Sequence, residues 1–364
     1  MTLDRIDVTP LRLPFETRQA MSPDWMLDGL YVALVQMRDS SGAEGLGYAC
    51  VVNRRYLAPL VAMVRGLAEM LEGADPDAIE QHWRRMRADV GVLAVEGLGQ
   101  MAIAALDIAL WDLRGRRLGQ PVHRLLGSSR DRIPCYASTY FVGVRTADDH
   151  VRLAQELVAK GFRAMKLGTP PGRTPERRAA PLRAMREALG ADVGLMVDCF
   201  QRLTAAEAMA LGRALEPVGL DWFEDPMPVE DVAGCAALAA ALDTPVTLGE
   251  SLYADAAFRQ VIDARATDIL MLDLLRVGGF TGWRRIALLA ETAHLPVVSH
   301  LMTEVSAHAL AATPHGLTLE YSPWTFPLFA TSPELDERGE VRLGDAPGLG
   351  LELAPDALAR FRLD

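Results

Sequence analysis

Lysine is almost absent from this chain of 364 residues. Only Lys160 and Lys166 are lysines, and the remaining 35 basic residues are arginines. An ammonium group is a compact charge that can lose its proton, whereas a guanidinium keeps its proton in proteins. Lys166 falls at the end of a predicted strand, so it is a candidate for a task that arginine cannot perform. Composition alone fits a chance distribution equally well.

The chain also has few cysteines, no long apolar run and no excess of basic charge. Its four cysteines lack a Cys-x-x-Cys pair and give no sign of a disulfide scaffold or a zinc knuckle. Apolar runs such as 60–64 fall far short of the ~18 residues of a membrane span, and the first residues lack a signal-peptide pattern. The net charge of −11 argues against nucleic-acid binding. We therefore expect a cytoplasmic enzyme with neither a nucleic-acid nor a membrane partner.

The pattern of the sequence changes near residue 130. Before it, strand-like runs precede helical stretches, which predicts an α+β domain over residues 1–128. Residues 129–330 alternate short apolar runs with Ala/Leu/Arg-rich stretches, as βα units around a parallel sheet do. No glycine-rich phosphate loop follows the first of these strands, which favours a barrel over a doubly wound sheet. Residues 331–364 form a Pro/Gly-rich C-terminal segment.

The predicted elements share one of two patterns, a short β-branched or apolar run or a helical period. The barrel strands are expected at 133–138, 163–168, 193–198, 220–224, 246–250, 268–273, 296–300 and 317–321, with helices such as 204–215, 229–241, 280–293 and 303–312. In the first domain we expect strands at 6–13 and 31–37 and helices at 57–72, 77–88 and 97–118. Residues 18–26 mix polar residues with Met and Trp, which predicts a loop that covers a site as a lid.

Acidic residues end three consecutive strands of the predicted barrel. Asp198, Glu224 and Glu250 recur at intervals of 26 residues, the length of one βα unit. The carboxyl ends of barrel strands converge on one mouth, and crowded carboxylates repel one another unless a cation is present. Three carboxylate oxygens suit Mg²⁺. A single acidic residue at a strand end is more often a helix cap or an arginine partner, but three in succession favour a magnesium site.

Other predicted strand ends carry residues suited to proton transfer. Asp273 and His300 end neighbouring strands, so we predict a dyad in which the carboxylate orients the imidazole as a general base. The alternative for this His is a hydrogen-bonded core residue. Lys166, across the mouth, either contacts the substrate or pairs with a carboxylate of the metal site. Glu320 either binds the metal or, if protonated, donates a hydrogen bond to a developing oxyanion.

These residues lie in segments that resemble the mandelate racemase subgroup of the enolase superfamily. The matching segments are GFRAMK (161–166), LMVD (195–198), WFEDP (222–226), LGE (248–250), VGGFTGW (277–283) and SHL (299–301), with ALDIALWDL (105–113), GQP (119–121) and LLG (125–127) in the first domain. The resemblance implies a homo-oligomer with an α/β fold, namely a modified TIM barrel (β/α)₇β with an N-terminal α+β capping domain. It also implies that the C-terminal segment returns to the cap.

The resemblance also implies roles for individual residues. Mg²⁺ is expected on Asp198, Glu224 and Glu250, and the base dyad is expected to be His300 with Asp273. Glu320 would hydrogen-bond the substrate carboxylate as its enediolate forms, and Lys166 would face that carboxylate as the first lysine of the family's Lys-x-Lys motif.

The second lysine of that motif is replaced by Gly168, which has no side chain. Racemisation needs a proton donor or acceptor on each face of the carbon, whereas β-elimination of water needs only one base, such as His300. We therefore predict a Mg²⁺-dependent dehydratase that acts on a small carboxylate, a 2,3-dihydroxy sugar acid, and releases a 2-keto-3-deoxy acid. The runner-up is a racemase or epimerase that uses Lys166 and His300 as opposing bases.

Three further alternatives carry less weight. An aldolase-type barrel would use Lys166 as a Schiff-base nucleophile, but it would have no use for the acidic residues. A muconate-type cycloisomerase is disfavoured because the sixth strand ends on Asp273 with no lysine nearby. A non-catalytic metal-binding homologue is possible in principle, yet the other catalytic positions carry competent residues.

The pocket that selects the sugar acid is expected to be less polar than a long polyhydroxy acid requires. Phe200 has the strand parity of Asp198, so its ring is expected to point into the pocket, and this suggests a short or deoxy sugar acid. The candidate pocket residues are Trp25, Arg54, Ser138, Tyr140, Phe200 and Trp324.

Overall fold

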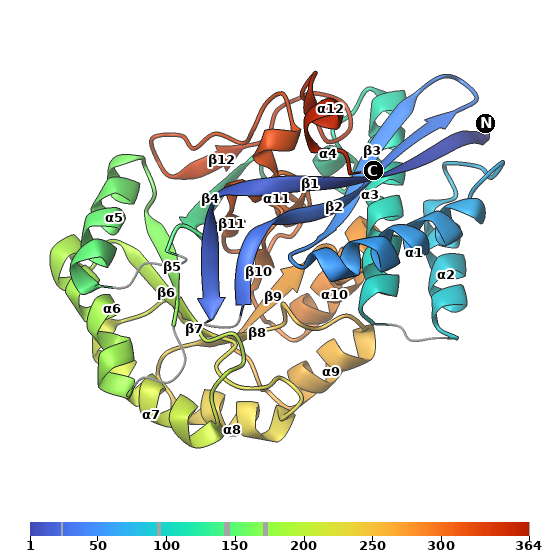
Figure 1. Ribbon diagram of the computed structural model, residues 1–364. Helices are drawn as coiled ribbons and strands as arrows, with labels where there is room; N and C mark the ends of the chain where they lie inside the picture. Colours follow the sequence, from blue (N-terminus) through green and yellow to red (C-terminus); the bar gives the residue numbers. More distant parts are fainter. Residues whose placement is uncertain (23–24, 93–95, 142–145, 170–173, 364) are drawn as a thin grey trace.

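The computed structural model describes the chain except for residues 23–24, 93–95, 142–145, 170–173 and 364, and it describes residues 16–22 and 25–26 by their backbone alone. The N-terminal part is an antiparallel sheet in the order β1-β2-β3, backed by helices (Figure 1). Its strands are β1 (Leu3–Ser22), β2 (Trp25–Asp39) and β3 (Glu44–Val51), and its helices include α1 (Leu57–Glu69), α2 (Ile79–Val90) and α3 (Leu98–Leu118). Among the described residues, no helix is long and apolar enough to span a bilayer.

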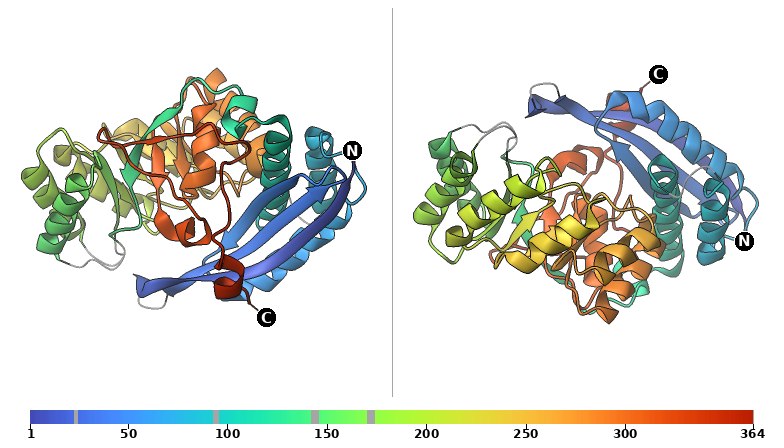
Figure 2. Two further views of the ribbon diagram at one scale, coloured as in Figure 1. Left: turned by 90° about the horizontal axis from the view of Figure 1, so that it is seen from above. Right: turned by 90° about the horizontal axis from the view of Figure 1, so that it is seen from below.

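In this part of the chain one strand was not predicted, and one predicted loop is part of a hairpin. β3 was not predicted, because Gly45 and Gly47 weaken the strand signal of its sequence. These glycines let α3 pack closely, since a Cβ at either position would lie 2.4 or 2.2 Å from a carbonyl oxygen of that helix. The loop predicted at 18–26 is the end of a hairpin, in which β1 continues to Ser22 and β2 begins at Trp25. Figure 2 shows this hairpin beside the barrel, projecting away from the cap helices.

Within its described residues, the barrel contains eight parallel strands and seven intervening helices, in agreement with the predicted (β/α)₇β fold. Hydrogen-bonded neighbours follow the order β10-β9-β8-β7-β6-β5-β4-β11. The circle is closed between β10 and β11, where the Leu317 amide donates to the Val297 carbonyl at 2.8 Å. The strands are β4 (Arg132–Ala137), β5 (Ala164–Gly168), β6 (Gly194–Asp198), β7 (Trp222–Glu224), β8 (Val246–Leu248), β9 (Ile269–Asp273), β10 (Val297–His300) and β11 (Leu319–Tyr321). The helices are α5 (Ala147–Ala159), α6 (Pro175–Leu189), α7 (Ala205–Leu215), α8 (Val232–Ala241), α9 (Asp255–Asp263), α10 (Gly279–Thr292) and α11 (Thr303–Ala311).

The cap is joined to the barrel at the start of α10. The N-cap of this helix is Gly278, which has no side chain to satisfy the first helical amides. Asp107 of α3 supplies the missing acceptor, since its Oδ2 receives the amide hydrogen of Thr281 at 3.0 Å. Trp83 of α2 donates to the Gly278 carbonyl at 2.8 Å. A Cβ at position 279 would lie 2.4 Å from Asp107 Oδ2, so this glycine permits the close approach.

The C-terminal residues lie against both parts of the molecule. β12 (Glu340–Arg342) pairs antiparallel with β4 of the barrel. Beyond it, the Leu349 amide donates to Asp112 of α3 at 2.6 Å. After α12 (Ala357–Phe361), the Leu363 amide donates to the Pro10 carbonyl of β1 at 2.9 Å. The chain therefore ends beside the sheet in which it begins.

Candidate active site

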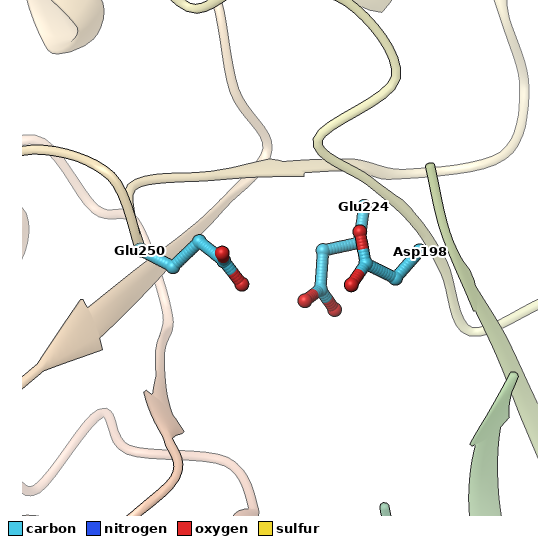
Figure 3. Close-up of side chains that lie close together, drawn as sticks. All are labelled: Asp198, Glu224 and Glu250. Atoms are coloured by element: carbon cyan, nitrogen blue, oxygen red, sulfur yellow. The ribbon is translucent and has the colours of Figure 1, made fainter. Parts of the chain in front are cut away.

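Three carboxylates converge at the carboxyl ends of β6, β7 and β8. Asp198 and Glu224 are the last residues of their strands, and Glu250 lies two residues beyond β8, which ends earlier than predicted. One oxygen from each lies within 4.8 Å of the others. Figure 3 shows the three side chains pointing toward one space. This is a donor set of the number and chemistry that a hard divalent cation prefers.

The electrostatics of this cluster also favour a bound cation. Burial and the charge of Glu250 raise the pKa of Asp198 well above its usual value. Burial and the neighbouring Asp198 and Glu250 likewise raise the pKa of Glu224, despite the opposing charge of Lys166. A divalent cation would neutralise the repulsion that produces these shifts.

Lys166 is buried among the carboxylates of the site. Its ammonium donates to Glu224 and lies 3.3 Å from Glu320, and these two carboxylates raise its pKa well above the usual value although burial opposes them. Lys166 therefore pairs with Glu224, a carboxylate of the metal site, which is one of the two roles considered for it from the sequence. A protonated amine is a poor Schiff-base nucleophile, so the raised pKa disfavours the aldolase alternative. Lys160, in contrast, is exposed and follows the last residue of α5.

His300 and Asp273 face each other across the ends of β10 and β9. His300 Nδ1 lies 2.6 Å from Asp273 Oδ2, and Nε2 lies 3.3 Å from Glu250 Oε2. Asp273 Oδ1 accepts the amide hydrogens of Leu275 and Arg276 at 2.8 and 2.9 Å. Burial lowers the pKa of His300, but Glu250 and Asp273 raise it to about 9. The ring is thus oriented by Asp273, with Nε2 directed toward the acidic cluster.

Glu320 is held as a hydrogen-bond acceptor. Its Oε2 accepts the amide hydrogen of Leu301 at 2.8 Å, and its Oε1 accepts the hydroxyl of Ser138. Burial raises its pKa, but Lys166 and His300 lower it below the usual value. The carboxylate is therefore ionised in this arrangement, which does not match the protonated donor considered from the sequence.

Phe200 occupies the space beside Gly168. A Cβ built at position 168 would lie 2.7 Å from the Cε2 of the Phe200 ring, so a longer side chain there would collide with the ring. Phe200 adopts a φ of 52°, a strained value for a residue with a side chain. The guanidinium of Arg202 also lies over the Phe200 ring, 5.1 Å from its centroid. Phe200 therefore stands at the mouth, where the sequence placed it.

The other predicted pocket residues are distributed more widely. Ser138 is buried against Glu320, and the Trp324 ring packs 4.9 Å from that of Phe15 on β1. Arg54 is exposed, three residues beyond β3. The side chain of Trp25 lies outside the described residues.

Tyr140 lies elsewhere than predicted. Its ring packs edge-on against buried Phe162 at 5.9 Å, and Phe162 packs in turn against Tyr321 at 5.3 Å. Tyr321 follows Glu320, so its side chain faces the opposite side of β11 from the carboxylate of the site. Tyr140 therefore belongs to an aromatic cluster on the outside of the barrel. Packing against these rings removes part of its apolar surface from water.

Sequence reasoning missed two residues that surround the cluster. Arg276 bonds the Glu250 carbonyl, and its guanidinium lies 3.7 Å from carboxylate oxygens of both Glu250 and Asp273. Gln201 bonds Asp225, which follows Glu224. Arg276 lies three residues after Asp273, and Gln201 lies three residues after Asp198. This closeness in sequence could have marked them as site residues, but it does not reveal their partners on other strands.

Comparison with known proteins gives consistent matches over the whole chain. Residues 6–127 match the family described as "Mandelate racemase / muconate lactonizing enzyme, N-terminal domain", and residues 149–357 match "Enolase C-terminal domain-like". The chain is 32% identical to a 3,6-anhydro-alpha-L-galactonate cycloisomerase of Streptomyces coelicolor, with 99% of both chains covered. It is 34% identical to an L-talarate/galactarate dehydratase of Salmonella typhimurium, with 90% of this chain and 81% of the relative covered.

Solved structures show the same likeness. A racemase from Streptomyces coelicolor with bound magnesium superposes with a TM-score of 0.94 at 31% identity, covering 99% of this chain and all of the other. An L-talarate dehydratase from Polaromonas, complexed with Mg and L-glucarate, gives a TM-score of 0.91 at 31% identity, covering 100% of this chain and 98% of the other.

Proposed function

Because the chain belongs to the mandelate racemase / muconate lactonizing enzyme family, we propose that it is a Mg²⁺-dependent dehydratase of a sugar acid. The substrate is a 2,3-dihydroxy carboxylate and the product a 2-keto-3-deoxy acid. The relatives support this proposal, since they include dehydratases of talarate/galactarate, xylonate and gluconate.

The observation that carries the proposal is the asymmetry of the site. His300 is a buried imidazole oriented by Asp273, with its free nitrogen directed toward the carboxylate cluster. The strand position that holds the second lysine of the family's motif is Gly168, and the Phe200 ring fills the adjoining space. One general base suffices for β-elimination, whereas racemisation needs two. The racemase alternative would require Lys166 to give up its ion pairs.

We assign Mg²⁺ to Asp198, Glu224 and Glu250, whose oxygens fit a hard cation. When bound there, the ion would offset the charge that builds on the substrate carboxylate as the α-proton leaves. By offsetting the charge of Glu250, which helps to raise the pKa of His300, the ion would also favour the neutral imidazole, whose Nε2 can accept a proton.

The chain's own residues would carry out the proton transfers. His300 removes the proton from C2 through Nε2, and the electron pair of the C–H bond moves into the carboxylate to give an enediolate. Lys166, charged and buried, stabilises this negative charge. When the enediolate collapses, the C3–O bond breaks, and the proton on His300 goes to the departing hydroxyl, which leaves as water. The enol that remains tautomerises to the 2-keto acid.

A cycloisomerase is the second candidate, because the relative from Streptomyces coelicolor carries that name at 32% identity over nearly the whole chain. The same proton abstraction by His300, followed by loss of a ring oxygen from C3, would open a ring without losing water. The products differ in mass: a dehydratase product is lighter than its substrate by one water, and a cycloisomerase product has the same mass.

A screen of sugar acids and their lactone or anhydro forms with Mg²⁺ tests both candidates. Semicarbazide detects the 2-keto product, and mass spectrometry distinguishes the two reactions. We expect the substitution His300→Asn to lower kcat by roughly 10³-fold or more, and EDTA to abolish turnover. A variant at an exposed histidine, His294→Asn, controls for the loss of an imidazole. Activity that survives both His300→Asn and EDTA would refute the proposed mechanism.

Three expectations about the chain as a whole remain predictions. They are the division of the chain at residues 128 and 330, the homo-oligomeric state, and the cytoplasmic location. Size-exclusion chromatography with light scattering would test the oligomeric state directly.

A further inference from the structure

The loops that follow β6, β7 and β8 are joined by one side chain, that of Gln201. The three proposed metal ligands lie where these strands end and the loops begin, at intervals of 26 residues in the chain. We propose that Gln201 is a positioning residue that sets the spacing of the three carboxylates. This inference rests on the metal site proposed above.

The hydrogen bonds of Gln201 use its whole amide. Its Nε2 donates to Asp225 Oδ2 and to Ser251 Oγ, both at 2.7 Å. Its Oε1 accepts the amide hydrogen of Val229 at 3.1 Å, and its own backbone amide donates to the Asp225 carbonyl at 2.7 Å. Asp225 follows the ligand Glu224 and Ser251 follows the ligand Glu250. A single amide group thus fixes the residues next to two of the ligands.

The third ligand is fixed through the backbone that carries Gln201. Asp198 Oδ1 accepts the amide hydrogen of Phe200 at 2.7 Å. Phe200 and Gln201 have φ values of 52° and 56°, and Asp225 has a φ of 38°. Residues with side chains avoid this left-handed region, so surrounding contacts must hold them there. The unusual turn directs the Gln201 side chain across to the loops after β7 and β8.

The chemistry of an amide suits this place. Asp225 is buried beside the acidic cluster, and its Oδ2 needs a donor. A lysine or arginine would supply donors but would also place a positive charge beside the cation site, where it would oppose binding of the metal. A carboxylate would add negative charge and would lose both donors. Glutamine gives two donors and one acceptor without charge.

Metal binding measured without substrate tests the proposal. The probe is Mn²⁺, titrated into the purified full-length chain and followed by the electron paramagnetic resonance signal of free and bound ion. We expect Gln201→Leu, which keeps the size of the side chain but removes its hydrogen bonds, to weaken Mn²⁺ binding by 10- to 100-fold. We also expect it to broaden the spectrum of the bound ion, because the three carboxylates are no longer held in one arrangement. Ser251→Ala, which removes one partner, should give a smaller loss in the same direction.

Two variants separate the possible outcomes. Gln260→Leu makes the same replacement at an exposed position on α9, and it should leave Mn²⁺ binding unchanged. Asp198→Asn removes a proposed ligand directly and should abolish binding. If Gln201→Leu and Ser251→Ala both bind Mn²⁺ as the parent does while Asp198→Asn does not, the metal site stands and the positioning role is refuted. If Asp198→Asn also binds normally, the proposed metal site itself is refuted.

Discussion

At the residue scale, Gly168 and Phe200 are one feature rather than two. The space that a side chain at position 168 needs is taken by the Phe200 ring, with 2.7 Å between the ring and a built Cβ. A lysine at 168 therefore needs room that a smaller residue at 200 would supply. We expect that one substitution alone would not convert the proposed dehydratase into a racemase.

We expect Gly168→Lys alone to add no proton exchange on the second face, because the ring blocks the new side chain. The double variant Gly168→Lys with Phe200→Ala should exchange the α-proton of the C2 epimer at least 10-fold faster than Phe200→Ala alone. Proton NMR of substrate recovered from D₂O measures this exchange.

Gly168→Met with Phe200→Ala is the matched control, since methionine has a similar length but no basic group. Exchange by Gly168→Lys alone at the rate of the double variant would mean that the ring is no obstacle.

The residues of the site differed in how far the sequence revealed them. Asp198, Glu224, Asp273 and His300 were predictable because a strand end is a local feature and the ends of barrel strands meet. Gln201 was not, because its partners lie on two other loops and its turn depends on left-handed backbone angles that only the packed structure imposes.

At the scale of elements, the start of α10 depends on an acidic side chain from another part of the chain. Burial raises the pKa of Asp107 to about 7, although hydrogen bonds from Thr281 oppose the shift. Between its usual pKa and 7, the folded state holds a proton that the unfolded state has lost. The free energy of unfolding therefore falls as the pH rises through this range.

We expect Asp107→Asn to flatten this pH dependence, because an amide does not titrate and still accepts from the Thr281 amide. The contribution removed is on the order of 4 kcal/mol between pH 4 and pH 7.5. Urea unfolding midpoints at several pH values measure it, with Asp4→Asn at an exposed position as the control. Equal pH slopes for the parent and Asp107→Asn would contradict this account of the interface.

Elements were predictable from the sequence where a short apolar run or a long Ala/Leu-rich stretch marked them, including strands such as β9 in which every residue is buried. α3 was predicted within one residue, and the eight barrel strands within two. β3 was missed, because two of its residues are glycines, which are rare in strands and are present here to admit α3. The hairpin of β1 and β2 was mistaken for a loop, because its polar residues do not form an apolar run.

At the scale of the whole molecule, the proposed cation would connect three βα units that the fold alone brings together at one end. A ligand that binds only the folded state stabilises it by mass action. We expect Mg²⁺ at 100 times its Kd to raise the thermal midpoint by roughly 3–4 °C. Differential scanning calorimetry with and without Mg²⁺ measures the shift, and Asp198→Asn should lose it. An equal shift in that variant would place the stabilising ion elsewhere.

The distribution of the two lysines has a practical consequence. Lys166 is buried in the ion pairs of the mouth, whereas Lys160 is exposed where α5 ends. In a barrel of alternating strands and helices, a helix that follows a strand ends on the side opposite the mouth. A lysine-directed linker would therefore attach the enzyme to a support by its base. The immobilised catalyst would then face the substrate stream with its pocket open.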